Sequence, residues 1–149
     1  MALFLRENEV SELLSVKECV EVLEAVFKAE GEGLAENTPR RRIRMPGGFF
    51  HFMAASWLGS NVFGYKAYGS FPGGRGKMIV MLYDGETGEL LCVLEASALG
   101  RIRTGAVTGL ATKYMSRQDS SVVGVIGSGS QARTQLEAVC AVRDIKQVR

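Results

Sequence analysis

The chain has 149 residues, of which 46% are hydrophobic and 23% charged, a composition typical of a soluble globular protein. No apolar run approaches the roughly 18–20 residues that span a bilayer, and charged residues follow the N-terminal apolar residues too early for a signal peptide, so we expect a cytoplasmic protein. The three cysteines, Cys19, Cys92 and Cys140, are widely spaced and contain no CxxC pair. This spacing argues against a disulfide framework or a zinc site, and we expect buried free thiols.

The net charge of +2 conceals an uneven distribution of charge along the chain. Nine of the 16 acidic residues lie between Glu7 and Glu36, whereas none occurs from Asn37 to Tyr83. Basic residues continue through this acid-free segment, namely Arg40, Arg41, Arg42, Arg44, Lys66, Arg75 and Lys77. Such a segment could contact nucleic acid or line a pocket for a small anion. A pI of about 8.5 is low for a nucleic-acid-binding protein, so we favour a small anion.

The N-terminal third of the chain is expected to be mainly helical. A short strand at 3–6 and a helical turn or two at 7–14 precede a longer helix at 16–31, whose apolar residues recur at helical spacing. Ser15 and Glu18 have the three-residue separation of a capping box at the start of that helix. The helix is interpreted as scaffold.

Residues 40–95 predict a strand-rich layer. Extended segments are expected at 40–45, 49–56, 62–71, 78–83 and 89–95. In an extended chain Arg40, Arg42 and Arg44 share one face, and Arg41 takes the other. The sequence Asp84-Gly-Glu-Thr-Gly88 is typical of a hairpin turn between the last two strands.

Two residues of this layer, His51 and Lys66, are candidates for chemistry. His51 is the only histidine, and it lies among aromatic residues with no second histidine or carboxylate at ligand spacing, which favours a structural role over a catalytic one. A single histidine also leaves nothing from which to build a Ser/His/Asp triad. Lys66 lies between Tyr65 and Tyr68. It is either an edge residue that reaches water or a site lysine in a partly dry pocket, and the sequence alone slightly favours the former.

From Ala96 the apolar residues recur at helical spacing over roughly 18 residues. Gly105 and Gly109, four residues apart, would allow another backbone to approach this helix closely. Arg103 and Thr104 precede them. At a helix start or kink, these two residues could offer N–H groups, a hydroxyl and a guanidinium together to an anion.

A strand, a glycine turn and a helix are expected in succession near the end of the chain. The apolar, β-branched run at 122–126 is of the kind that forms a strand buried on both faces, and helical spacing resumes at 131–142. Between them, Gly127, Gly129 and Ala132 match the Gly-x-Gly-x-x-Gly/Ala pattern of dinucleotide-binding proteins. The first glycine permits a tight turn, the second lets a pyrophosphate approach the backbone, and the small third residue lets the helix pack closely. An ordinary strand–turn–helix is the alternative interpretation.

A dinucleotide-binding unit also needs a second strand, which usually ends in an acidic residue about 20 positions after the glycines. The chain stops at Arg149, where that strand is beginning at Gln147. We therefore expect an incomplete nucleotide-binding domain.

Several separated motifs resemble those of the ornithine cyclodeaminase/μ-crystallin family of NAD(P)-dependent proteins, and the resemblance extends from Leu3 to Arg149. The motifs are Pro39-Arg-Arg-Arg-Ile-Arg-Met-Pro46 with Met53-Ala-Ala, Gly64-Tyr-Lys66, Tyr83-Asp-Gly-Glu-Thr-Gly-Glu-Leu-Leu91, Arg103-Thr-Gly-Ala-Val-Thr108 and Val125-Ile-Gly-Ser-Gly-Ser-Gln-Ala132. The resemblance implies an α/β protein that is the N-terminal portion of such a fold. A mixed α+β substrate-binding and dimerisation domain at 1–118 would be followed by the first β-α unit of a truncated, incomplete Rossmann domain at 119–149.

The resemblance also implies roles for particular residues. Arg42 would bind a substrate carboxylate, although the run of arginines at 40–44 leaves the choice among them open. Lys66 would contact the substrate at the reacting carbon as the catalytic acid/base or polarising group. Arg103, helped by Thr104, would pair with the substrate carboxylate or a cofactor phosphate. The residues expected to surround the pyrophosphate of NAD or NADP are Gly127, Gly129, Ser130, Gln131 and Ala132.

The function implied by the resemblance is NAD(P)-dependent oxidoreduction or deamination of a small amino or imino acid by a homodimer, without a nucleic-acid or membrane partner. Members of the family include cyclising deaminases, amino-acid dehydrogenases and ketimine reductases, and the sequence does not separate lyase from dehydrogenase or reductase. A non-catalytic small-ligand-binding protein and an inactive truncated remnant are the alternatives.

Overall fold

The computed structural model describes residues 1–74 and 76–149, so Arg75 of the acid-free segment lies outside the described residues. The chain divides into two compact units. The first unit comprises residues 1–10 and 26–97, and the second comprises residues 11–25 and 98–149. The predicted domain boundary between residues 118 and 119 stays a prediction. No helix in the described residues is long and apolar enough to cross a membrane.

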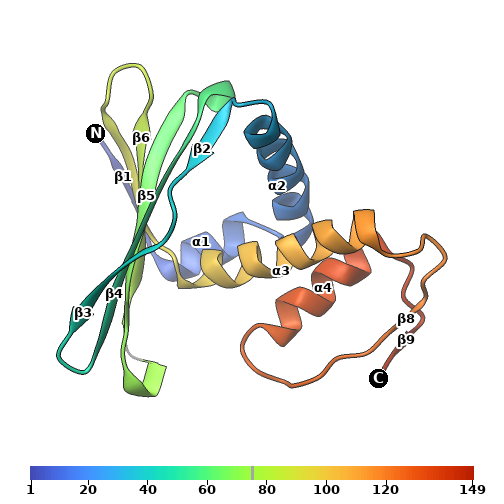
Figure 1. Cartoon of the computed structure of the whole chain (residues 1–149). Coiled ribbons are helices and arrows are strands. Elements are labelled where there is room, and N and C mark those ends of the chain that lie inside the picture. The colour runs from blue at the N-terminus through green and yellow to red at the C-terminus, as the bar shows by residue number, and fades with distance from the viewer. Residues whose placement is uncertain (75) are drawn as a thin grey trace. The chain divides into compact units, whose positions relative to one another are not determined.

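Within the described residues, seven strands of the first unit form one sheet (Figure 1). Their order is β1-β7-β6-β5-β4-β2, and β3 also pairs with β4. The strands are β1 (Leu3–Leu5), β2 (Ala35–Asn37), β3 (Arg41–Met45), β4 (Gly48–Trp57), β5 (Val62–Ser70), β6 (Met78–Asp84) and β7 (Leu90–Glu95). The pairing is antiparallel except between β1 and β7. Two short 3-10 turns, η1 (Leu58–Ser60) and η2 (Pro72–Gly74), follow β4 and β5. The predicted strand-rich layer is confirmed.

The turn between β6 and β7 is held by Asp84. Its Oδ1 accepts hydrogen bonds from the backbone N–H groups of Thr87, at 2.7 Å, and Glu86, at 2.9 Å. These bonds favour the ionised carboxylate and hold the pKa of Asp84 below its usual range. Gly88 then takes a φ of 72°, which a glycine adopts without strain. The hairpin expected from this sequence is therefore confirmed.

Cross-strand register assigns the side chains of β3 and β4 to two faces of the sheet. Arg42 pairs with His51, and His51 pairs in turn with Tyr68 of β5, so these three side chains share one face. Arg41 pairs with Phe52 and belongs to the opposite face. That opposite face carries large apolar side chains that are 36% to 58% exposed, and we call it the apolar sheet face: Ile43, Phe50, Phe52, Phe63 and Ile79.

The N-terminal helices are α1 (Glu7–Leu13) and α2 (Val16–Gly31). The predicted capping box at the start of α2 is confirmed. Ser15 Oγ accepts a hydrogen bond from the Glu18 N–H at 3.2 Å, and Glu18 Oε2 accepts one from the Ser15 N–H at 3.0 Å. The Ser15 hydroxyl also donates to Glu18 at 2.6 Å, and these bonds lower the pKa of the Glu18 carboxyl.

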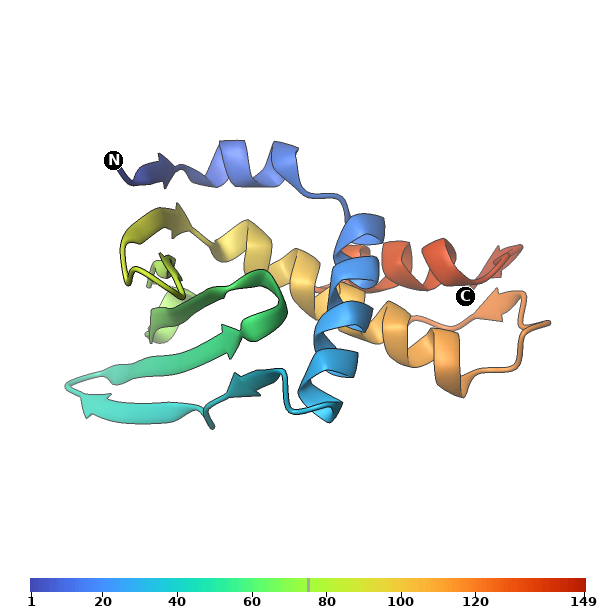
Figure 2. The ribbon, with the colours of Figure 1, turned by 90° about the horizontal axis from the view of Figure 1, so that it is seen from above.

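The second unit is organised around the contact between α3 (Ser97–Met115) and α4 (Ala132–Val142), which lie against each other in both views of the chain (Figures 1 and 2). A Cβ atom built on Gly105 would lie 2.5 Å from the backbone carbonyl carbon and oxygen of Thr134. One built on Gly109 would lie 2.8 Å from the Ala138 carbonyl oxygen. The two glycines therefore admit a close backbone, as their spacing predicts. The buried residues of this core are Val16, Cys19, Val20, Ala106, Leu110 and Ala138.

Arg143, directly after α4, caps the C-terminal end of α3. Its Nη2 donates to the carbonyl oxygens of Lys113 at 2.8 Å, Thr112 at 3.1 Å and Ser116 at 3.1 Å. Its Nε donates to Ser116 Oγ at 3.0 Å. The last carbonyls of a helix have no partner within the helix and carry partial negative charge, so a guanidinium satisfies and stabilises them.

The glycine-rich region is flanked by a small parallel sheet of β8 (Val122–Val123) and β9 (Gln147–Val148). The predicted second strand is therefore present. The prediction of a strand at 122–126 buried on both faces is wrong, because β8 has two residues, Val122 is 52% exposed and Ile126 is fully exposed. In the described part of the chain β9 is the only strand that pairs with β8, so the other edge of β8 has no strand beside it.

The cysteines are free, and two of them are buried as expected, Cys19 and Cys92. Burial raises the pKa of both thiols. The expectation that Cys140 is buried is wrong, because this residue is exposed on α4. It lies two positions after the buried Ala138, a rotation of roughly 200° about the helix, so it is turned away from the α3 contact.

Candidate functional site

The first unit brings two predicted site residues, Arg42 and Lys66, to the same face of the sheet. Lys66 lies two positions before Tyr68 on β5, and its Nζ is 5.8 Å from the centre of the Tyr68 ring. The Tyr68 ring stacks on the His51 ring, with the ring centres 4.4 Å apart and the planes 11° apart. Arg42 Cζ lies 5.8 Å from the centre of the Phe49 ring, one strand away. We call the group Arg42, Phe49, His51, Lys66 and Tyr68 the basic sheet face.

The basic sheet face carries positive charge with no acidic residue on its own strands. The sequence of β3, β4 and β5 contains neither aspartate nor glutamate. His51 is buried, and its burial, together with the charges of Arg40 and Arg42, holds the imidazole pKa below its ordinary value, so the ring is neutral at pH 7. The cations on this face include Arg42 and Arg44, which are exposed, and Lys66, which is half-buried. Cations around a neutral aromatic pair suit a small anion such as a carboxylate.

Arg103 and Thr104 belong to the second unit and lie inside α3. The helix runs from Ser97 to Met115, so the expectation of a helix start or kink at these residues is wrong. The Thr104 hydroxyl donates to the Gly100 carbonyl oxygen at 2.7 Å, as threonine in a helix interior commonly does. Arg103 is exposed. Its proposed anion contact would come from the guanidinium alone, and that role stays a prediction.

The glycine loop before α4 has the space that a bound phosphate needs. A Cβ atom on Gly127 or Gly129 would meet no atom within 4 Å, and Gly127 has a φ of 95° that favours glycine. A cavity of about 450 Å³ adjoins the loop, and its lining includes Gly127, Gly129, Ser130, Gln131 and Ala132. These are the five residues that the resemblance assigns to the pyrophosphate, and they surround one opening.

Two further features of the glycine loop suit a dinucleotide. Ala132 begins α4 and no side chain caps that helix end, so the positive end of the helix dipole faces the opening. The buried Oε1 of Gln131 has no hydrogen-bond partner among the described residues. A buried polar atom without a partner is unusual, and a ligand hydroxyl would satisfy it. Thr108 of α3 also lines the cavity, and sequence reasoning did not single it out although it ends the Arg103–Thr108 motif.

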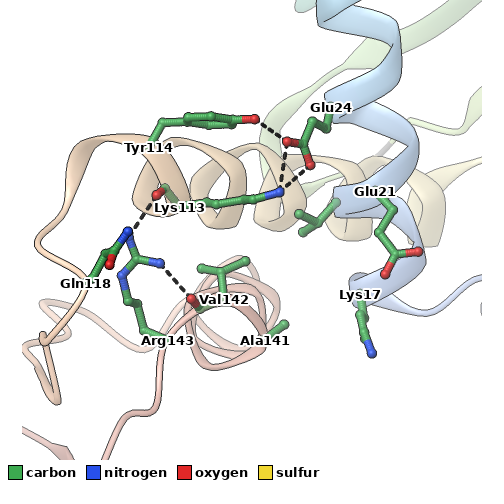
Figure 3. Close-up of a pocket in the computed structure, with 10 residues that line it drawn as sticks. Lys17, Glu21, Glu24, Lys113, Tyr114, Gln118, Ala141, Val142 and Arg143 are labelled. Atoms are coloured by element: carbon green, nitrogen blue, oxygen red, sulfur yellow. Dashed lines mark hydrogen bonds and ion pairs between the residues drawn. The ribbon is translucent and has the colours of Figure 1, made fainter.

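A second hollow in the same unit, of about 610 Å³, is lined by residues of α2, of α3 and the loop after it, and of the C-terminal end of α4 with Arg143 (Figure 3). Lys113 Nζ donates to both carboxylate oxygens of Glu24, at 2.6 and 2.8 Å, and the Tyr114 hydroxyl donates to the same carboxylate. These bonds lower the pKa of Glu24 and raise that of Lys113. Glu24, Lys113 and Arg143 are thus engaged in structural contacts, and the sequence did not indicate this hollow. Among the described residues, no group of His, Cys, Asp or Glu could hold a metal ion.

Comparison with known proteins places these features in a family context. The sequence model of the ornithine cyclodeaminase/mu-crystallin family matches residues 1–149. The alanine dehydrogenase of Archaeoglobus fulgidus is 36% identical over 153 residues, an alignment that covers 99% of this chain and 47% of that protein. The chain spans about half the length of the curated relatives that it matches along its whole length.

Solved structures give the same result. The Δ1-pyrroline-2-carboxylate reductase of Thermococcus litoralis, in complex with NADH and L-proline, superposes with a TM-score of 0.91 at 34% identity, covering 98% of this chain and 48% of that one. An archaeal alanine dehydrogenase dimer with bound NAD superposes with a TM-score of 0.92 at 35% identity, covering 99% of this chain and 47% of that one. The mixed α/β fold is therefore that of the N-terminal portion of these proteins.

Proposed function

Because the chain belongs to the ornithine cyclodeaminase/mu-crystallin family, we propose that it supplies the substrate face and the cofactor loop of an NAD(H)-dependent oxidoreductase that acts on a small amino or imino acid. The observation that carries the proposal is the basic sheet face, where Arg42 and Lys66 share one face of a sheet whose central strands carry no acid. The relatives support the reaction class, since they are named as a dehydrogenase and a reductase.

The substrate carboxylate would bind Arg42, whose planar guanidinium can donate two parallel hydrogen bonds to it. Lys66 would lie beside the reacting carbon, with its ammonium group as proton donor to the substrate nitrogen or as a polarising charge. The half-buried position of Lys66 against Tyr68 limits its freedom and would keep the proton at a defined place.

The cofactor would be held by the glycine loop, with the pyrophosphate against Gly127 and Gly129 and near the start of α4. Ser130, Gln131 and Ala132 would complete this cradle, and bound NADH would supply a hydride to the α-carbon of the imino acid. Arg103 and Thr104 would contact a cofactor phosphate or the substrate carboxylate. We propose NAD(H) because two structures of relatives contain it.

Replacing Arg42 by glutamine should weaken binding of a small amino or imino acid by about 10- to 150-fold, the equivalent of losing roughly 1.5–3 kcal/mol of charge-assisted hydrogen bonding. Arg41→Gln is the matched control, because Arg41 is the adjacent residue on the opposite face of the sheet. Its effect on the same titration should be close to zero. Arg42→Lys should restore only part of the affinity, since the forked geometry is lost.

Variants at four basic positions separate a small-anion site from a nucleic-acid surface. A surface that follows nucleic acid would lose similar affinity for duplex DNA at Arg40, Arg41, Arg42 and Lys77, with a steep dependence on salt. Equal losses on DNA at all four positions, with no response to the small acid, would contradict the proposed function.

Replacing Gly129 by valine should weaken NADH binding by well over tenfold, because the side chain would occupy the space through which the pyrophosphate approaches the backbone. The folded state should be little affected, since a Cβ at this position meets no atom within 4 Å. NADH fluorescence titration measures the affinity. Gly31→Val is the control, because Gly31 also has open space around it but lies at the end of α2. An unchanged NADH affinity in Gly129→Val would exclude this loop as the cofactor site.

We also propose that the protein is a homodimer, as the archaeal alanine dehydrogenase is. The apolar sheet face supports this proposal, because five large apolar side chains there are each more than a third exposed. A second copy of the same face could cover it through a two-fold axis. Sedimentation velocity distinguishes the dimer from a monomer.

A further inference from the structure

His51 has an unsatisfied nitrogen at the centre of the basic sheet face. Its side chain is 6% exposed, and its buried Nδ1 has no hydrogen-bond partner among the described residues. Buried polar atoms are nearly always paired, so an unpaired one constrains which ring nitrogen carries the proton. A phenylalanine at this position would stack on Tyr68 without burying a polar atom, so packing alone does not explain a histidine here.

The side chains that share this face with His51 on β3, β4 and β5 include cations and aromatic rings and no acid. Arg42 belongs to β3 and Arg40 directly precedes that strand. Lys66 and Tyr68 belong to β5 on the other side of β4. Phe49, on β4 itself, lies with its ring centre 6.4 Å from that of His51. Burial of the ring and the charges of Arg40 and Arg42 lower the pKa of His51, so the imidazole is held neutral and carries one N–H.

The position of that proton follows from the burial of Nδ1. An orphaned buried N–H is rarer than an under-satisfied buried acceptor, so the unpaired Nδ1 is better accommodated as a lone pair than as an N–H group. The proton then resides on Nε2, and Nε2–H is the donor that His51 can offer to a ligand.

We propose that His51 is a ligand-binding residue whose Nε2–H donates a hydrogen bond to the carboxylate held by Arg42. The inference rests on the proposed function and deepens it, because it assigns a second donor to the substrate carboxylate. Arg42 and His51 are directly opposed on neighbouring strands, a relation that places Cβ atoms about 4.5–5.5 Å apart. A carboxylate has two oxygens and accepts more than one donor. A neutral donor beside Arg42 fixes the orientation of the carboxylate without adding a further positive charge, and Lys66 would face the reacting end of the substrate.

Nitrogen-15 NMR of the imidazole tests this assignment directly, because His51 is the only histidine and its resonances need no variant to assign them. The free protein should show the Nε2–H tautomer. Added L-proline should shift the Nε2 resonance and raise the pKa of His51, because the bound carboxylate offsets the field of Arg40 and Arg42. L-prolinamide, which has the same ring but no carboxylate, should do neither. An Nδ1–H tautomer, or equal responses to the two ligands, would overturn the inference.

Two variants at the same position complete the test. His51→Phe keeps an aromatic ring on Tyr68 but removes the donor, and it should weaken L-proline binding about tenfold or more at an unchanged melting temperature. His51→Gln places an amide N–H at a similar reach and should recover part of the affinity. Full affinity in His51→Phe, with a loss in Arg42→Gln, would refute the role of His51 but not the proposed function. Full affinity in both variants, or no L-proline response in the unaltered protein, would contradict the proposed function itself.

Discussion

Replacing Lys66 by alanine should lower turnover by about 100-fold or more, which is the usual contribution of a positioned proton donor or acceptor. Stability should change little, because Lys66 is only half-buried. Steady-state oxidation of NADH with a cyclic imino acid measures the turnover, and a thermal melt measures the stability.

Lys77→Ala is the matched control for Lys66→Ala. Lys77 belongs to the same acid-free segment but is exposed and precedes β6, so its loss should leave turnover within about twofold, as surface substitutions away from a site usually do. Normal turnover in Lys66→Ala, combined with a lowered melting temperature, would return Lys66 to a structural role.

Replacing Gly105 by leucine should destabilise the second unit by about 3 kcal/mol or more. The new Cβ would lie 2.5 Å from the backbone of Thr134, which cannot rotate away as a side chain can, so α4 as a whole must shift. Leucine improves the helix propensity of α3 by only about 1 kcal/mol, which is less than the cost of the overlap. Urea unfolding followed by circular dichroism measures the difference in the free energy of unfolding.

Gly31→Leu provides the comparison for Gly105→Leu, because a Cβ on this helical glycine meets no atom within 4 Å. It should unfold at nearly the urea concentration of the unaltered protein. Equal midpoints for Gly105→Leu and Gly31→Leu would mean that α3 and α4 are not in the close contact described.

Much of the fold could be predicted because its signals are local. The capping box at Ser15 and Glu18, the turn at Asp84 and the close approach at Gly105 are each signalled by residues a few positions apart. The opposite faces of Arg41 and Arg42 follow from the two-residue period of any strand. Features that depend on distant neighbours were not predicted. Strand β2 has three residues and no hydrophobic alternation, so only its pairing with β4 reveals it.

The candidate site shows the same division between local and distant information. The glycine loop is contiguous in sequence, and its five predicted residues do line one cavity. The exposure of β8 could not be predicted, because an apolar run does not reveal how many strands pair with it. The capping of α3 by Arg143 likewise joins residues about 30 positions apart, and a lone arginine after a helix gives no signal of it. The unpaired nitrogen of His51 is visible only once its neighbours are placed.

Hydride transfer itself can be followed with NADH that carries two deuterium atoms at C4 of the nicotinamide ring. The protein is incubated with this NADH and a cyclic imino acid, and the product amino acid is examined by mass spectrometry and NMR. We expect one deuterium at the α-carbon of the product for each NADH oxidised. A product without deuterium at that carbon, or NADH that is not consumed in the presence of the imino acid, would contradict the proposed oxidoreductase function.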